Sequence, residues 1–468
     1  MPCRFFWQVR DKFVNIIFLL SVILKGIGAV LEILLQILIT RGLGLDGYGT
    51  YSTWINAADL VFWILFSALT KCNTFYLSLP DVSIKKFKRQ YYSRYVLPVL
   101  GAAALLALGF GKSSYCIVIL ITLLELKTLD QSSTLMAQRH QVFSLVGEYI
   151  LGRLILVLGL LMLQKAGVLT LAALLVLYAF QYIVIILMFT VFQRLKVSAS
   201  KDISNEVSLK KWGSYQRADF FQAMIGQMPV LLQFFFSGAF EAGVVSIVLT
   251  VKKLINFISG PTAKVFLPEF SRLYRNGQTD KIRESFASIM RIQMLFAGPL
   301  SVVLIGYPHV VLRILADDLL AYTSLFILCS VVFIVTATLG PCSGVLQMTG
   351  NENKDNLFRE IAIIAMVVVM VLFRGDKLFV LYGLCAQTAL EAIGKYCYVC
   401  YWMKRPPVKL TTYASWWVCP AAAIAAAYAL HLEDSLLCML LAAAAVFGIG
   451  LIAELRTEGG LMKMLGRK

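Results

Sequence analysis

The chain has 468 residues, of which 59% are hydrophobic and only 15% are charged. This composition is too apolar for a soluble globular protein and predicts an all-α polytopic membrane protein. The formal net charge of +17 is spread over many short segments, so no single basic footprint for nucleic acid forms and no nucleic-acid partner is expected.

Apolar runs of about 20 residues predict about fourteen transmembrane helices. The predicted spans are 14–39, 54–78, 95–111, 115–137, 143–164, 168–192, 215–237, 243–267, 286–306, 322–346, 358–373, 378–402, 412–430 and 434–455. Lysine and arginine gather in alternate loops, which places both termini in the cytoplasm. The first run is too long for a signal-peptide core and is expected to be retained.

The first predicted span, SVILKGIGAVLEILLQILIT at 21–40, carries a lysine and a glutamate near its middle. Lys25 and Glu32 are seven residues apart and therefore fall on one face of an α-helix. Ser21, Gly28 and Gln36 continue this stripe, whereas the residues around it are apolar. We therefore expect one face of this helix to turn away from lipid.

Similar polar stripes occur at helical spacing in the second, seventh and eighth spans. The second span carries Asn56, Asp59, Trp63, Ser67, Lys71 and Thr74. The seventh carries Arg217, Asp219, Gln222, Gly226, Pro229 and Gln233, and the eighth carries Ser246, Thr250, Lys253, Asn256, Gly260 and Lys264 beside Lys252. These stripes favour a cavity surrounded by the first, second, seventh and eighth helices.

The fourth and fifth spans contain a second charged set. Its members are Glu125, Lys127, Asp130, Glu148 and Arg153. We interpret them as ion pairs inside the first bundle, with a direct role in transport as the alternative.

A polar and basic segment at 194–212 divides the chain into a bundle of six spans and a longer second part. The predicted organisation is an N-terminal bundle at 1–193, a cytoplasmic linker at 194–212, a second six-helix bundle at 213–403, and two further helices with a tail at 404–468. LPDVS at 79–83 matches LPEFS at 267–271. Gly42 and Gly47 likewise match Gly238 and Gly243, which predicts a repeat of the two bundles in the same membrane orientation.

Cationic groups outnumber anionic ones in the polar stripes, which favours an anionic ligand. A charge at mid-bilayer costs at least ~2.5–3.5 kcal/mol, so it needs a partner or a water-filled site. The predicted cationic binding surface consists of Lys25, Lys71, Arg217, Lys252, Lys253 and Lys264. Snorkelling to the headgroups is the alternative for Lys71 and Lys264, and an ion pair with Glu32 is the alternative for Lys25.

Three carboxylates face the same predicted cavity: Glu32, Asp59 and Asp219. A carboxylate near lysines in a low-dielectric site can exchange a proton or bind a cation as the site opens. We therefore expect at least one of them to couple transport to a proton or sodium gradient or to the membrane potential.

Nothing in the sequence favours a metal centre, a cofactor or an enzyme. The chain has three histidines, and most of its ten cysteines lie inside predicted spans, so we expect no metal site and read the CxxC of Cys397 and Cys400 as packing residues. A membrane-embedded glycan polymerase or ligase would need a long external loop for acid–base chemistry, and every predicted external loop is short.

Three stretches resemble the Wzx-type polysaccharide repeat-unit flippases of the multidrug/oligosaccharidyl-lipid/polysaccharide (MOP) exporter superfamily. ITRGLGLDGYGTYS at 39–52 resembles that family's first hairpin. FSGAFEAGVVSIVLTVKKLINFISGPTAKVFLPEFSRLYRNG at 236–277 resembles its signature of the seventh and eighth spans, and LQMTGNENKDNLFRE at 346–360 resembles the turn after its tenth span. Together these stretches cover 71 of the 468 residues.

The resemblance implies two pseudo-symmetric six-helix lobes that rock between inward-open and outward-open states around a cationic cavity. It also implies an oligosaccharide joined by a diphosphate to a polyprenol as the substrate, and a monomer in the cytoplasmic membrane that contacts membrane lipids and glycan assembly proteins. Many repeat-unit flippases have twelve spans, whereas lipid II flippases have fourteen. A lipid II-type flippase and a multidrug or cation exporter of the same superfamily are the alternatives.

Overall fold

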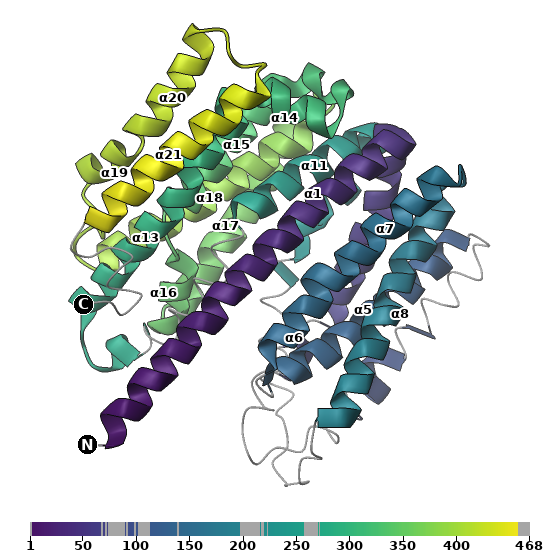
Figure 1. Cartoon of the computed structure of the whole chain (residues 1–468), viewed down its shortest axis with the longest axis horizontal. Coiled ribbons are helices and arrows are strands. Elements are labelled where there is room, and N and C mark those ends of the chain that lie inside the picture. Colours follow the sequence, from purple (N-terminus) through teal and green to yellow (C-terminus); the bar gives the residue numbers. More distant parts are fainter. Residues whose placement is uncertain are drawn as a thin grey trace. The chain divides into compact units, whose positions relative to one another are not determined.

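The structure is a computed structural model that describes residues 2–66, 69–70, 73, 89, 92–97, 100–101, 113–137, 140–196, 216, 220–221, 223–256, 270 and 272–456. Every regular element within these residues is helical, which confirms the all-α class (Figure 1). The helices separate into two compact units. One unit comprises Ile23–Ser246, and the other comprises Met1–Val22 with Ile247–Lys468. We call them the Ile23–Ser246 unit and the C-terminal unit.

The Ile23–Ser246 unit begins inside a long first helix and ends inside α11. Its elements are α1 (Pro2–Leu65), η1 (Tyr92–Val96), α5 (Ser113–Ala137), α6 (Gln141–Leu145), η2 (Val146–Leu151), α7 (Gly152–Lys165), α8 (Leu171–Lys196), α10 (Met228–Ser237) and the first half of α11 (Ala239–Ile255). Helix α8 packs against both α5 and α7. Leu135, Ile185 and Phe189 are buried together where α5 meets α8.

The C-terminal unit contains the rest of α11 and a bundle of longer helices. Its further elements are α13 (Thr279–Ser301), η3 (Val302–Gly306), α14 (Pro308–Leu315), η4 (Asp317–Tyr322), α15 (Thr323–Ala337), α16 (Cys342–Met348), α17 (Glu352–Leu372), α18 (Phe379–Trp402), α19 (Leu410–Trp416), α20 (Val418–Ala429) and α21 (Leu436–Arg456). Helix α18 packs along α17 and also contacts α15, while α13 packs against α21 (Figure 1).

Several helices coincide with the predicted spans. The bounds of α5, α8, α18 and α21 lie within a few residues of the spans predicted at 115–137, 168–192, 378–402 and 434–455. Within the described residues, six helices are long and apolar enough to cross a membrane, as a multi-pass membrane protein requires. The count of fourteen stays a prediction, because the third predicted span lies largely outside the described residues. The division into bundles at 1–193 and 213–403 also stays a prediction.

Two glycines interrupt the helices at the predicted hairpins. Gly44 breaks α1 with a φ of 73°, and Gly238 separates α10 from α11 with a φ of 113°. Positive φ values are accessible to glycine at little cost because it has no Cβ. Each break therefore lies where the sequence predicts the connection between the first two spans or between the seventh and eighth.

The two hairpins contact each other through a reciprocal pair of glycines five residues after the breaks. A Cβ atom added at Gly49 would collide with the carbonyl group of Ala239. A Cβ atom added at Gly243 would lie 2.7 Å from the carbonyl oxygen of Leu45. Because Leu45 and Ala239 each follow a break glycine directly, the two halves of the contact use equivalent positions.

This contact corrects the register of the predicted repeat. The sequence alignment paired Gly42 and Gly47 with Gly238 and Gly243, whereas the backbone breaks place Gly44 opposite Gly238. The error is two residues, and it arose because three closely spaced glycines allow more than one match. The LPDVS and LPEFS motifs lie outside the described residues except for Phe270, so superposition of spans 1–6 on spans 7–12 stays a prediction.

Replacing Gly49 with alanine is expected to lower the melting temperature of the purified protein. The new Cβ would overlap a backbone carbonyl of Ala239, which cannot move aside as a side chain can. Gly226→Ala is the matched control, because no atom of the described residues, apart from the chain neighbours and the helix's own backbone, lies within 4 Å of the added Cβ, and alanine is favoured over glycine in a helix by about 1 kcal/mol. Equal melting temperatures for the two variants would show that the hairpin contact does not matter for stability.

Candidate functional site

Two neighbouring lysines lie on α11, near the middle of the predicted eighth span. The Lys252 side chain is partly buried, and its Nζ donates a hydrogen bond of 2.8 Å to Oγ1 of Thr388 on α18. The same Nζ lies 5.1 Å from the ring centroid of Phe333 on α15, which adds a cation–π contact. Lys253 is exposed and has no hydrogen bond or ion pair within the described part of the chain. Both lysines lie in the last turn of α11, and their position near the middle of the membrane stays a prediction.

Thr388 holds Lys252 without neutralising it. Its hydroxyl donates to the carbonyl oxygen of Leu384 at 2.7 Å, which uses its single proton and leaves its lone pairs to accept from Lys252. A hydroxyl carries no charge, so the positive charge of Lys252 is positioned but not compensated. Such a cation can still attract an anion.

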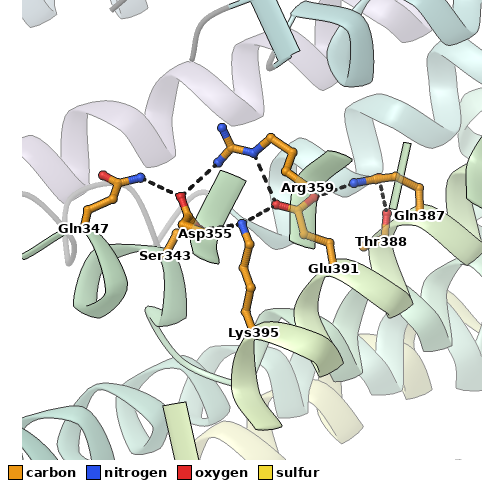
Figure 2. A network of polar contacts seen from close by, with 8 residues as sticks. All are labelled: Ser343, Gln347, Asp355, Arg359, Gln387, Thr388, Glu391 and Lys395. Carbon is orange, nitrogen blue, oxygen red and sulfur yellow. Dashed lines mark hydrogen bonds and ion pairs between the residues drawn. The ribbon is translucent and has the colours of Figure 1, made fainter. Parts of the chain in front are cut away.

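A cluster of four charged residues lies where α17 and α18 pack together, and three of them are buried while Glu391 is partly buried (Figure 2). The Nζ of Lys395 is 2.7 Å from a carboxylate oxygen of Asp355 and 2.6 Å from one of Glu391. Arg359 lies 3.6 Å from each of the same two carboxylates. The side chains of Lys395 and Asp355 are only 2% and 1% exposed. Two anions are thus matched by two cations in a region from which water is largely excluded.

Neutral side chains extend this charge cluster in both directions (Figure 2). Gln347 on α16 donates to Asp355 at 2.9 Å, and Ser343 accepts from Lys395 at 2.9 Å. Gln387 donates to Glu391 at 2.5 Å. Because Gln387 precedes Thr388, the cluster reaches the residue next to the acceptor of Lys252.

The sequence analysis did not single out Glu391 or Lys395. The available signal was an acid and a base four residues apart inside the apolar span at 378–402, a spacing that brings two side chains together on one helix face. Their partners on α16 and α17 lie in LQMTGNENKDNLFRE at 346–360. That stretch contributed to the family resemblance, and the structure shows that it supplies Gln347, Asp355 and Arg359 to a buried ion-pair network.

The Ile23–Ser246 unit has its own ion pair. The carboxylate of Glu32 on α1 lies 2.6 Å from Nε of Arg153 on α7. Arg153 therefore has an ion-pair partner on the first helix, Glu32, which lies outside the charged set of the fourth and fifth spans for which we predicted ion pairs. Lys25 lies with its Nζ 5.5 Å from the ring centroid of Tyr149.

The other carboxylates of this unit have different surroundings. Asp130 accepts a hydrogen bond of 2.7 Å from Asn73. Glu125 is buried, and its Oε2 has no hydrogen-bond partner within the described residues. The negative charge of Asp59 acts on Glu125, so one of the predicted coupling residues lies close to a second acid.

Four of the predicted site residues lie outside the described residues, namely Lys71, Arg217, Asp219 and Lys264. Of the others, the structure brings Lys252 and Lys253 together on α11, and it places Lys25, Glu32 and Asp59 in the Ile23–Ser246 unit. Within the described residues, no group of three or more histidine, cysteine, aspartate or glutamate side chains could hold a metal ion.

Comparison with known proteins identifies the fold. No protein-family model and no curated protein matches the chain. The solved structure of the lipid II flippase MurJ in an inward closed conformation matches with a TM-score of 0.64 and 11% identity, over 93% of this chain and 98% of that chain. An inward-facing multidrug resistance MATE family transporter of the MOP superfamily matches with a TM-score of 0.59 and 11% identity, over 83% of this chain and 98% of that chain.

A third solved structure, MATE in complex with MaD3S, matches with a TM-score of 0.57 and 12% identity, over 84% of this chain and 96% of that chain. At these identities the matches establish the fold alone. The chain therefore has the fold of MurJ and the MATE transporters, which is the fold that the sequence resemblance to the MOP superfamily predicts.

Proposed function

We propose that this protein is a flippase that carries a polyprenyl-diphosphate-linked oligosaccharide across the cytoplasmic membrane by alternating access. Its product would serve the assembly of a cell-surface polysaccharide. The fold supports a transporter rather than an enzyme, because both kinds of protein that share it are named as a flippase or as transporters. The choice of an anionic, lipid-linked substrate rests on the lysines of α11.

The single observation that carries the substrate choice is that two consecutive residues of α11, Lys252 and Lys253, are lysines without a carboxylate ion-pair partner among the described residues. Lys252 is held by a neutral hydroxyl and an aromatic ring, and Lys253 has no partner within the described part of the chain. Two like charges inside a predicted span repel each other and are costly to desolvate. An anionic ligand near these two lysines would relieve both penalties.

A diphosphate fits this pair better than a single carboxylate because it presents several charged oxygens. Lysine is a flexible point charge that can follow a phosphate group as a transporter changes conformation. The polyprenol would stay in the bilayer, so that only the diphosphate and the sugars need a polar path. Lys25, Lys71, Arg217 and Lys264 are the further proposed members of this cationic surface.

Ion coupling is a separate part of the proposal. Glu32, Asp59 and Asp219 remain the candidates, and the ion pair of Glu32 with Arg153 offers one way in which protonation could be linked to movement of α1 against α7. A transport rate that did not change after the proton gradient, the sodium gradient and the membrane potential had all been collapsed would exclude coupling.

A lipid II-type flippase and a multidrug or cation exporter are the alternative functions, since the chain shares its fold with a protein of each kind. A cation exporter should present uncompensated carboxylates to its ligand. In the C-terminal unit the carboxylates of Asp355 and Glu391 are instead compensated by Lys395 and Arg359. In the C-terminal unit this charge pattern favours an anionic ligand over a cationic one, whereas in the Ile23–Ser246 unit Oε2 of the buried Glu125 has no hydrogen-bond partner within the described residues.

The proposal can be tested by ligand binding to the full chain in lipid nanodiscs. We expect a polyprenyl diphosphate to bind at least about tenfold more tightly than the uncharged polyprenol of the same length, because charge-assisted contacts to lysine are lost in the alcohol. A lipophilic cation should not compete with the diphosphate. Equal binding of the diphosphate and the alcohol, or displacement of either by the cation, would contradict the proposal.

A further inference from the structure

We propose that Lys395 and Arg359 act as positioning residues for Lys252, because they hold the carboxylate of Glu391 and thereby leave Lys252 available to an anionic ligand. The identity of the ligand rests on the proposed function. The competition of Lys252 with Lys395 and Arg359 for the carboxylate of Glu391 does not rest on the proposed function. It follows from the contacts within the C-terminal unit.

The positive and negative charges of the cluster balance each other. Asp355 and Glu391 contribute two negative charges, and Arg359 and Lys395 contribute two positive charges, so the cluster is neutral when all four are ionised. Lys252 is not needed for this balance. Its direct polar contact is the hydroxyl of Thr388.

Glu391 is within reach of Lys252. Glu391 follows Thr388 by three residues on α18, so the two side chains are neighbours on one face of that helix. The side chain of Gln387 contacts both residues. Its Nε2 donates to Glu391 at 2.5 Å, and its Oε1 lies 3.2 Å from the hydroxyl of Thr388 (Figure 2). The negative charge of Glu391 also acts on Lys252 directly.

Removing Lys395 would leave the cluster with a surplus negative charge. The two carboxylates would then share only Arg359, whose contacts with them are both 3.6 Å, longer than the contacts of Lys395. The surplus negative charge would attract Lys252, because an ion pair with a carboxylate is stronger than a hydrogen bond to a hydroxyl. Lys252 would move from Thr388 toward Glu391 and be lost to the ligand.

The test compares three variants of the full chain in nanodiscs: Lys395→Met, Glu391→Gln and the double variant. Lys395→Met carries the surplus negative charge, whereas the double variant is again neutral. Glu391→Gln removes the competing carboxylate and controls for the loss of the glutamate. Lys354→Met removes an exposed lysine from α17 and controls for the loss of a positive charge near the cluster.

The first measurement is the experimental structure of the Lys395→Met variant without a ligand. We expect the Nζ of Lys252 within hydrogen-bonding distance of the Glu391 carboxylate, instead of on Thr388. This measurement does not depend on the nature of the substrate. Retention of the hydrogen bond between Lys252 and Thr388 in this variant would overturn the inference.

The second measurement is the affinity for a polyprenyl diphosphate. We expect Lys395→Met to bind about tenfold more weakly or worse than the wild type, and the double variant to recover most of that loss. A purely structural role for Lys395 would give no recovery, so equally weak binding by the single and double variants would overturn the inference.

If the wild type itself did not bind the diphosphate, the proposed function would fail, and the structure of Lys395→Met would still decide this inference. If Lys395→Met did not fold, the inference would require stronger diphosphate binding by Glu391→Gln than by the wild type.

Discussion

Glycan export is expected to fall about 100-fold or more when both lysines of α11 are neutralised in a Lys252→Gln/Lys253→Gln variant. The physical reason is that each lysine would lose a charge-assisted contact to the diphosphate, and such contacts are worth about 1.5–3 kcal/mol each. The measurement is the amount of surface polysaccharide per copy of membrane-inserted protein. Lys165→Gln, which removes an exposed lysine at the end of α7, should leave export at the wild-type level.

The single variants separate the two lysines. Arginine should replace either lysine better than glutamine, because it keeps the charge, although its planar guanidinium does not reproduce the geometry of an ammonium. Lys252→Arg is expected to be the less active of the two arginine variants, since the site formed by Thr388 and Phe333 is partly buried. Wild-type export by the double glutamine variant would show that these charges are structural.

Replacing Asp355 with alanine is expected to produce the largest loss of stability, about 3–5 kcal/mol. The side chain of Asp355 is 1% exposed and contacts both Lys395 and Arg359. Its removal would leave two buried cations with the single carboxylate of Glu391. It would also remove the acceptor of Gln347 on α16, so the contact of α16 with α17 and α18 should loosen.

The melting temperature of the purified protein measures this effect. Glu352→Ala is the matched control, because Glu352 is an exposed acid in the first turn of the same helix and surface substitutions usually change stability by less than about 0.5 kcal/mol. A melting temperature for Asp355→Ala close to that of Glu352→Ala would mean that the buried cluster does not stabilise the fold.

The hydrophobic pattern was sufficient to predict several of the helices. Runs of about 20 apolar residues gave bounds close to those of α5, α8, α18 and α21 because a membrane span demands length and apolarity and little else. The breaks at Gly44 and Gly238 could also be predicted from the sequence, since helix breaks at hairpins favour glycine. The register of the repeat could not be predicted, because three closely spaced glycines fit the same pattern.

The pairing of charged residues on different helices could not be predicted from the sequence. Periodicity shows which residues share a face of one helix, but it does not show which helix lies opposite. Glu32 and Arg153 are 121 residues apart in the chain, and no sequence pattern favours this pair over others. The contact of Lys395 with Asp355 has the same difficulty, because it depends on how α17 packs along α18. Its contact with Glu391 joins two residues four apart on α18, which helix periodicity does predict.

The most direct test of the account is translocation by the purified chain in proteoliposomes. A polyprenyl-diphosphate-linked oligosaccharide is placed in one leaflet, and its appearance in the other is followed with a membrane-impermeant lectin or glycosidase. We predict translocation that requires the chain and that falls in Lys252→Gln/Lys253→Gln to the level of empty liposomes. A chain that left the lipid-linked oligosaccharide in place but moved a lipophilic cation across the same membrane would contradict the account.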